Sequence, residues 1–177
     1  MSDHYLVISA LGKDRPGIVN TLSKAALDSS CNITNSRMTV LGGEFALILL
    51  IQGSQTAVTE MERRLPGLER DLTLTITAKP TALRVPEQRW LPYHVEVVAI
   101  DNPGIVHAIT EFFSSRKINI EELETETYQA PVTATTLFSL QMTVAVPAAT
   151  AIAALREAFF DFCEDLNLDA TLEPVRD

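Results

Sequence analysis

The sequence has few of the residues that mark secreted, membrane or metal-binding proteins. Only two cysteines occur among the 177 residues, and they do not form a Cys-x-x-Cys pair, which argues against a disulfide framework or a zinc site. The longest apolar run, residues 45–51, is far shorter than the roughly 20 residues of a membrane-spanning helix. The N-terminus also lacks the features of a signal peptide. We therefore expect a cytoplasmic protein with two free thiols.

Catalytic and metal-binding patterns are also missing. His4, His94 and His107 are the only histidines, and none has a metal-ligand spacing or a cysteine nearby. The sequence contains no G-x-S-x-G, P-loop or Rossmann glycine motif. Ser9 and Cys31, as potential nucleophiles, have no histidine at a characteristic distance in the sequence. We therefore expect a protein that is not an enzyme and that holds no metal and no cofactor.

Positive charge is scarce in the second half of the chain, which carries the whole net charge of −9. Residues 1–87 contain nine Lys/Arg and nine Asp/Glu, whereas residues 88–177 contain five and fourteen. Such a surface repels a phosphate backbone, so we expect no direct binding to nucleic acid. The negative charge either serves solubility alone or attracts a basic protein partner, and the sequence leaves both interpretations open.

What the chain does contain is an internal repeat. Residues 14–19, with the sequence DRPGIV, recur as residues 101–106, with the sequence DNPGIV. At the same offset of 87 positions, Asn32-Ile33 recurs as Asn119-Ile120 without any gap. In both copies the apolar residues after Pro-Gly follow the spacing i, i+1, i+4, i+7, i+8, which is one stripe of a helix. The chain is therefore predicted to be a duplicated domain.

Each copy shows the same order of predicted elements, βαββαβ. A strand precedes the motif, the striped helix follows it, and two strands, a second helix and a last strand complete the copy. This order is the α+β ferredoxin-like arrangement, an antiparallel sheet with both helices on one face. The predicted domains are residues 1–79 and 92–177, joined by a linker at 80–91. The predicted elements are strands 5–10 and 93–100, second strands from Ile33 and Ile120, third strands 45–52 and 135–144, second helices 56–65 and 148–166, and last strands 72–77 and 170–173.

The Asp-x-Pro-Gly motif has a purely structural interpretation. Proline suits the first position of a helix, Asn102 is a good N-cap, and an aspartate is stabilised beside a helix N-terminus. A functional interpretation uses the same geometry. The N–H groups of a helix start bind a carboxylate, and the aspartate pairs with an ammonium group, so together they fit an amino acid. Asn32 and Asn119 are expected beside this turn, where either their amides contact the same ligand or they serve only as turn residues with a left-handed backbone.

A βαββαβ unit with Asp-x-Pro-Gly-Ile-Val between the first strand and first helix resembles the ACT domain family. These regulatory modules bind amino acids between this loop of one domain and the second strand of a neighbouring domain. The resemblance covers nearly the whole chain, as two ACT-like domains with nothing appended. Asn102 bonds a small zwitterion better than Arg15 does, which favours the second loop as the working site. The resemblance implies these effector-binding residues: Asp14, Pro16, Gly17, Ile18, Asn32 and Ile33 in the first copy, and Asp101, Asn102, Pro103, Gly104, Ile105, Asn119 and Ile120 in the second.

A tandem of this length also resembles a family that represses the glycine cleavage genes. That resemblance implies an amino-acid sensor that acts on transcription indirectly, by binding a transcription activator, with glycine as the effector. Formation of a homo-oligomer stays open. The alternative is a regulatory subunit of an amino-acid metabolic enzyme.

An acidic stretch marks the second strand of the second copy. Glu122, Glu124 and Glu126 alternate along it and therefore share one face. They form either a solvated strand edge that discourages aggregation or a docking surface for a basic protein partner.

Overall fold

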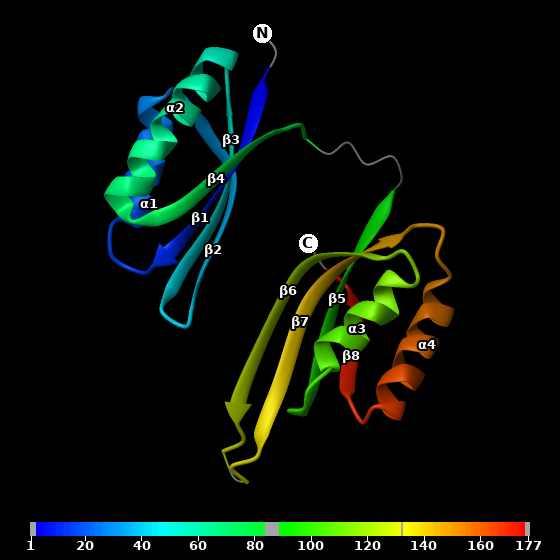
Figure 1. The fold of residues 1–177 in the computed structure, drawn as a ribbon. Helices are drawn as coiled ribbons and strands as arrows, with labels where there is room; N and C mark the ends of the chain where they lie inside the picture. The colour runs from blue at the N-terminus through cyan, green and yellow to red at the C-terminus, as the bar shows by residue number, and fades with distance from the viewer. Residues whose placement is uncertain (1–2, 84–88, 132, 176–177) are drawn as a thin grey trace. The chain divides into compact units, whose positions relative to one another are not determined.

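The computed structural model describes residues 3–83, 89–131 and 133–175. The chain divides into two compact units, Met1–Val85 and Pro86–Asp177, and each repeats the order βαββαβ (Figure 1). None of the helices formed by the described residues is long and apolar enough to cross a membrane. The first unit contains β1 His4–Lys13, α1 Ile18–Asp28, β2 Asn32–Leu41, β3 Glu44–Gly53, α2 Gln55–Leu72 and β4 Leu74–Thr81. The second unit contains β5 Trp90–Ile100, α3 Ile105–Ser114, β6 Asn119–Gln129, β7 Thr136–Pro147, α4 Ile152–Asp165 and β8 Asp169–Pro174.

Each unit forms one four-stranded antiparallel sheet, with the strand orders β2-β3-β1-β4 and β6-β7-β5-β8. The two helices of a unit cover one face of its sheet, because alternate residues of the central strands are buried beneath them. The α+β class and the ferredoxin-like order predicted from the sequence are therefore confirmed. In both units the opposite face of the sheet is left uncovered by the unit's own helices.

The apolar stripe of each first helix forms the centre of its core. Ile18, Leu22, Ala25 and Ala26 are buried on α1, and Ile105, Ile109, Phe112 and Phe113 are buried on α3. The larger side chains of α3 meet α4 in an aromatic cluster, in which the rings of Phe112 and Phe113 lie 5.2 and 5.3 Å from that of Phe159. The two cores are thus filled differently, as the sequences of the two stripes indicate.

Several predicted boundaries are wrong. The helix expected to end at Leu65 continues through Pro66 to Leu72, because Leu68 and Leu72 still pack on the core. Leu72 therefore closes a helix rather than opening a strand. The helix expected from residue 148 begins at Ile152, after a turn in which the N–H of Thr150 donates to the carbonyl of Pro147.

The predicted linker at 80–91 lies mostly between two strands. Thr81 ends β4, which pairs with β1, and Trp90 begins β5, which pairs with β7. Residues 84–88 of this stretch lie outside the described residues.

Candidate functional site

The repeated motif forms the connection between the first strand and first helix of each unit. The backbone N–H of Asp14 donates to the carbonyl of Gly43 at 3.1 Å, and the N–H of Asp101 donates to that of Thr136 at 3.1 Å. Each aspartate therefore continues the pairing of its strand with the third strand for one more bond. The following residues leave the sheet in the same way in both units, so the repeat in sequence is a repeat in geometry.

Both first helices begin at a glycine with a left-handed backbone. Gly17 has φ 96° and Gly104 has φ 100°, and neither N-cap supplies a side-chain hydrogen bond. By contrast α2 is capped by Ser54, whose hydroxyl accepts a bond from the N–H of Ala57 at 3.2 Å. The first-turn N–H groups of α1 and α3 thus receive no bond from their capping residue, which leaves them for water or a bound anion.

This geometry corrects the structural interpretation of the motif. Asn102 was expected to cap α3, but its amide nitrogen donates to the carbonyl of Ile100 at 3.3 Å instead. Pro16 and Pro103 were expected at the first helical position, whereas each lies before the glycine N-cap. The reason is that the left-handed glycine turns the chain only after the proline, so the helix starts at the isoleucine.

The space around these helix starts is open. Cβ atoms added to Gly17 or Gly104 would meet no other atom within 4 Å. The two aspartates, the two prolines and Asn102 are exposed. Ile18 and Ile105 are buried in the cores, at 2% and 6% exposure, so only their backbone N–H groups can contact a ligand at the surface.

The two loops differ in the contact made by the second residue of the Asp-x-Pro-Gly motif, which is Arg15 in the first loop and Asn102 in the second. A guanidinium nitrogen of Arg15 donates to the carbonyl of Asp71 at 3.0 Å, at the C-terminal end of α2. A cation is stabilised there by the negative end of the helix dipole. Arg15 therefore ties the first loop to α2, while the amide of Asn102 donates to Ile100, two residues earlier at the end of β5. This contrast favours the second loop as the site with freedom to receive a ligand.

The predicted asparagines do not lie beside the loop of their own unit. Asn32 pairs with Gln52, at the opposite end of β3 from Glu44, which pairs with Lys13 just before the loop. Eight residues of strand separate the two positions, or roughly 27 Å. Asn119 pairs with Ala145 and is likewise remote from Asp101, which bonds to Thr136. The expectation that Asn32 and Asn119 flank their own turn is wrong, because β1 and β2 run in the same direction.

The strand starts nevertheless share one local feature in both units. A register irregularity follows Ile33 in β2 and Ile120 in β6, and both isoleucines are half-buried against their cores. Asn32 and Asn119 precede them and are exposed. These asparagines can therefore meet an Asp-x-Pro-Gly loop only if the loop belongs to a different unit.

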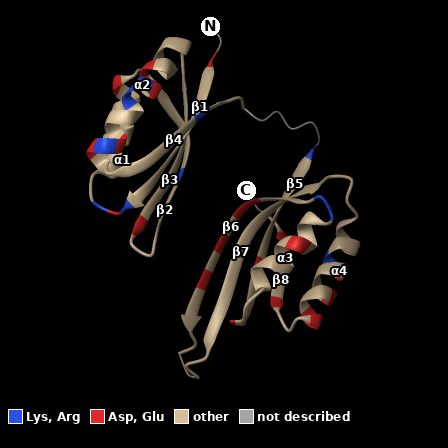
Figure 2. Ribbon diagram, in the orientation of Figure 1, with Lys and Arg blue, Asp and Glu red and all other residues tan. Residues whose placement is uncertain are grey.

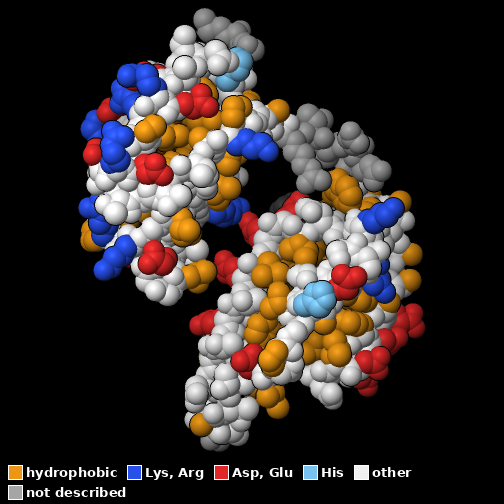
Figure 3. All heavy atoms as spheres, viewed as in Figure 1, with side chains coloured by type: hydrophobic (Ala, Val, Ile, Leu, Met, Phe, Trp, Pro, Cys, Tyr) orange, Lys and Arg blue, Asp and Glu red, His pale blue; other side chains and the backbone are white. Residues whose placement is uncertain are grey.

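The acidic residues of β6 lie where the alternation predicts. Glu122, Glu124 and Glu126 pair with Thr143, Gln141 and Ser139 of β7 and point to the face of the sheet without helices. β6 is an outer strand of its sheet, so these residues lie at a strand edge, which is compatible with both interpretations of the acidic stretch. Figure 2 shows the acidic positions along β6, and Figure 3 shows acidic side chains over this edge of the second unit.

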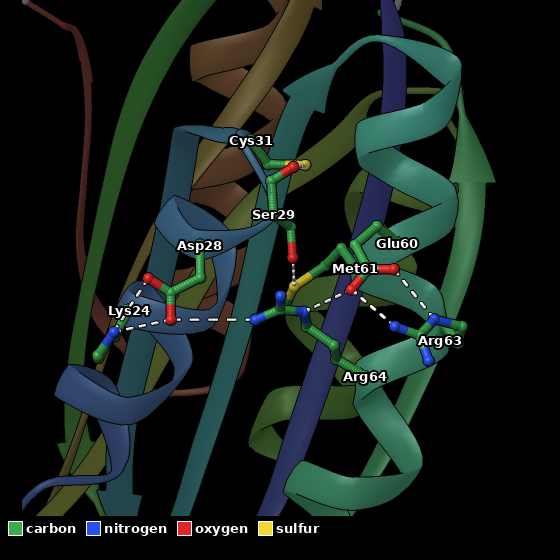
Figure 4. A network of polar contacts seen from close by, with 8 residues as sticks. All are labelled: Lys24, Asp28, Ser29, Cys31, Glu60, Met61, Arg63 and Arg64. Atoms are coloured by element: carbon green, nitrogen blue, oxygen red, sulfur yellow. Dashed lines mark hydrogen bonds and ion pairs between the residues drawn. The ribbon is translucent and has the colours of Figure 1, made fainter.

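A cluster of charged side chains lies between the two helices of the first unit (Figure 4). Asp28 of α1 bonds Lys24 at 2.7 Å and lies 3.9 Å from Arg64 of α2. Glu60 bonds both Arg63 and Arg64, and these two arginines lower the pKa of its carboxyl from 4.5 to about 2. The cluster borders an open hollow of about 480 Å³. The contact between Arg64 and Asp28 links α1 to α2, and the other ion pairs of the cluster lie within one helix.

The residues once considered as nucleophiles or ligands have ordinary surroundings in the described part of the chain. No group of three or more His, Cys, Asp or Glu residues there could hold a metal ion. The hydroxyl of Ser9 bonds that of Thr77, and His94 lies 3.2 Å from Glu96 on the sheet surface. Burial raises the pKa of Cys31, and raises that of Cys163 to about 11, so both are protonated and poor nucleophiles at neutral pH.

The comparisons with known proteins agree with this fold and these loops. A family model described as the ACT domain matches residues 4–79, the first unit. The second unit repeats its topology and its loop. The molecule is thus of the class of tandem ACT-domain proteins, which are regulatory.

Full-length relatives narrow this class. The chain is 37% identical to the glycine cleavage system transcriptional repressor of Escherichia coli (strain K12) over 98% of its own length and 92% of that protein, and equally to that of Shigella flexneri. A solved structure of an unknown protein from Galdieria sulphuraria is 32% identical, with a TM-score of 0.80, and covers 99% of this chain and 100% of its own. The chain belongs to the family of the glycine cleavage system transcriptional repressor.

Proposed function

We propose that this protein senses an amino acid, most simply glycine, and controls transcription by binding a transcription activator rather than DNA. The observation that carries the sensing step is the uncapped start of α3 next to an exposed aspartate. The regulatory step is supported by the identity of the chain to repressors of the glycine cleavage system. Such a protein works in the cytoplasm and needs no catalytic centre.

The proposed ligand position follows from the charges of the loop. The carboxylate of an amino acid takes the N–H groups of the first turn of α3, where the helix dipole favours a negative charge. The ammonium group then faces the carboxylate of Asp101. Gly104 leaves open space over the helix start. A phosphate fits less well, because it would meet Asp101 as a like charge.

The position of β6 and β2 adds a condition to this proposal. Asn119 and Asn32 lie at the far ends of their own sheets from the loops. We therefore place the amide contact, from Asn32-Ile33 or Asn119-Ile120, in a domain that neighbours the loop rather than in the same domain. A ligand held between two domains strengthens one packing arrangement over another, which is how it would alter binding of the activator.

Calorimetric titration of the full chain with glycine, serine, alanine and larger amino acids tests the sensing step. We expect heat with glycine and weaker heat as the side chain grows. Asp101→Asn keeps the size of the side chain but removes the charge that faces the ammonium group, so it is expected to weaken binding about tenfold or more. Asp161→Asn on the outside of α4 is the matched control. No heat with any amino acid would exclude a sensor of this kind.

The first loop supplies an internal comparison. Asp14→Asn is expected to weaken glycine binding much less than Asp101→Asn, because Arg15 commits that loop to α2. Equal losses from the two variants would show that both loops bind the ligand.

Capture of partners on the immobilised full chain tests the regulatory step. We expect a transcription activator to be retained, and the amount retained to change when glycine is added. Retention of an amino-acid metabolic enzyme instead would assign the chain as a regulatory subunit and would contradict the proposal.

A further inference from the structure

Strands β4 and β8 each leave one row of backbone groups unpaired by any other strand. They are outer strands of their sheets, so β4 pairs only with β1 and β8 only with β5. In an antiparallel pair the backbone groups of successive residues point alternately towards the partner strand and away from it. The N–H of Val175 donates to the carbonyl of Pro92, so the odd-numbered residues of β8 face β5 and the even-numbered residues face outward. Such an outward row is a template on which a strand of another chain can pair.

The second helix of each unit supplies a side chain to this outward row. In the first unit Oε1 of Glu69, in the last turn of α2, accepts a hydrogen bond from the backbone N–H of Ile76 at 3.0 Å. In the second unit a guanidinium nitrogen of Arg156 in α4 donates to the carbonyl of Leu172 at 2.6 Å. Because α2 packs on β4 and α4 packs on β8, each side chain reaches its strand from the helix-covered face. The two units use opposite charges for this contact, since an N–H needs an acceptor and a carbonyl needs a donor.

Proline occupies a second position of each outward row. Pro80 follows Ile76 by four residues and Pro174 follows Leu172 by two, and an even separation keeps both prolines on the outward side. A proline has no N–H, so an added strand finds no donor at that position. β4 and β8, with 8 and 6 residues, are also the shortest strands of their sheets, whereas the opposite outer strands, β2 and β6, contain no proline. Short outer strands and outward prolines both limit pairing between chains.

The position of the Arg156 side chain indicates a bond rather than packing alone. Its Nε is buried and has no hydrogen-bond partner within the described residues. A buried donor without a partner costs free energy, and an apolar side chain would fill the same space without that cost. The guanidinium is therefore accounted for by its contact with β8.

We propose that Glu69 and Arg156, together with Pro80 and Pro174, close the outer edges of β4 and β8 to strands of other chains. An added strand would lie about 4.8 Å away and would place its own carbonyl oxygen about 2.9 Å from an outward N–H. Oε1 of Glu69 already holds that place. Once the bonds and the prolines are removed, the occupant of the opened edge is a strand of a second copy of this chain. The proposal concerns the sheet edges and is independent of the effector and of the activator.

Amide hydrogen exchange followed by NMR tests the bond of Glu69 directly. Glu69→Ala is expected to raise the exchange rate of the Ile76 amide roughly tenfold or more, because the acceptor is lost. Glu69→Gln retains an oxygen that can accept the bond, so the rate should stay near that of the natural chain. Glu62→Gln, two turns earlier on the same face of α2, is the matched control. The inward amide of Thr77 reports unfolding of the whole unit and should change far less than that of Ile76.

Sedimentation velocity of the full chain over a range of concentrations tests the closure of the edges. Glu69→Ala/Pro80→Thr opens β4 and Arg156→Met/Pro174→Thr opens β8, and each variant is expected to form larger species than the natural chain. Ser54→Ala destabilises the first unit without touching β4, so it separates an opened edge from lost stability and should sediment as the natural chain does. Circular dichroism confirms that each variant is folded.

Three results would overturn the proposal. The first is an Ile76 exchange rate that Glu69→Ala leaves unchanged, or raises no more than that of Thr77. The second is a pair of opened variants that sediment as the natural chain does. The third is association of Ser54→Ala as strong as that of the opened variants, which would trace the larger species to lost stability.

Discussion

The substitution Gly104→Ala isolates the conformational requirement of the second loop. Gly104 is the N-cap of α3 with φ 100° and ψ −10°, a backbone conformation that residues with a Cβ rarely adopt. An added Cβ would meet nothing within 4 Å. The substitution therefore changes the backbone strain without creating a clash.

The expected cost follows from two opposing terms. Holding alanine at a positive φ costs of the order of 1–3 kcal/mol. Replacing glycine also restricts the unfolded chain, which offsets about 0.4–1 kcal/mol of that cost. We expect the free energy of unfolding of the second unit to fall by about 1–2 kcal/mol. For a domain of this size, each kcal/mol lowers the melting temperature by about 4–8 °C.

The single tryptophan makes the assay specific for the second unit. Trp90 lies in β5, so its fluorescence reports unfolding of that unit, whereas circular dichroism reports both. Gly17→Ala makes the same change in the first unit and should leave the Trp90 transition in place. Gly67→Ala, in the interior of α2 and also with open space, should stabilise the first unit by about 0.5–1 kcal/mol. If Gly104→Ala were as stable as the natural chain, the argument from the left-handed helix start would be refuted.

Three further predictions concern packing, capping and pH. Phe113→Ala removes a fully buried ring of the second core and should lower the free energy of unfolding of the second unit by about 3–5 kcal/mol. In a urea titration the change of Trp90 fluorescence that marks unfolding should then occur at a much lower urea concentration. A loss of less than about 1 kcal/mol would contradict the packing described. Ser54→Ala removes the cap of α2 and should destabilise the first unit by about 1 kcal/mol in urea melts followed by circular dichroism, whereas Thr59→Ala, within the helix, should cost less. The folded state lowers the pKa of Glu60 to about 2, so the stability that Glu60 contributes is present above its ordinary pKa of 4.5 and is lost as the pH falls towards 2. Glu60→Gln should flatten the dependence of melting temperature on pH in that range, and an unchanged slope would count against the ion pairs.

The repeat in the sequence was sufficient to predict the duplicated fold. The apolar stripe after each Pro-Gly identified the first helices, because burial of one helix face requires that spacing. The boundaries of the second helices were less predictable. Pro66 is a local signal to stop a helix, yet packing of Leu68 and Leu72 on the core outweighs the hydrogen bond that the proline removes.

The candidate site, like the fold, was predictable from the sequence only in part. The sequence by itself determined that an aspartate and a glycine precede each first helix, since these residues adjoin one another in the chain. It also determined the common face of Glu122, Glu124 and Glu126, since alternation along a strand is a local property.

Only the tertiary structure decided which residues lie near these loops. The pairing of β1 and β2 with opposite ends of β3 separates Asp14 from Asn32, and the contact of Arg15 with Asp71 distinguishes the first loop from the second. Strand order and register depend on contacts between residues far apart in the sequence. A local pattern therefore cannot specify them, although it specifies each element that takes part.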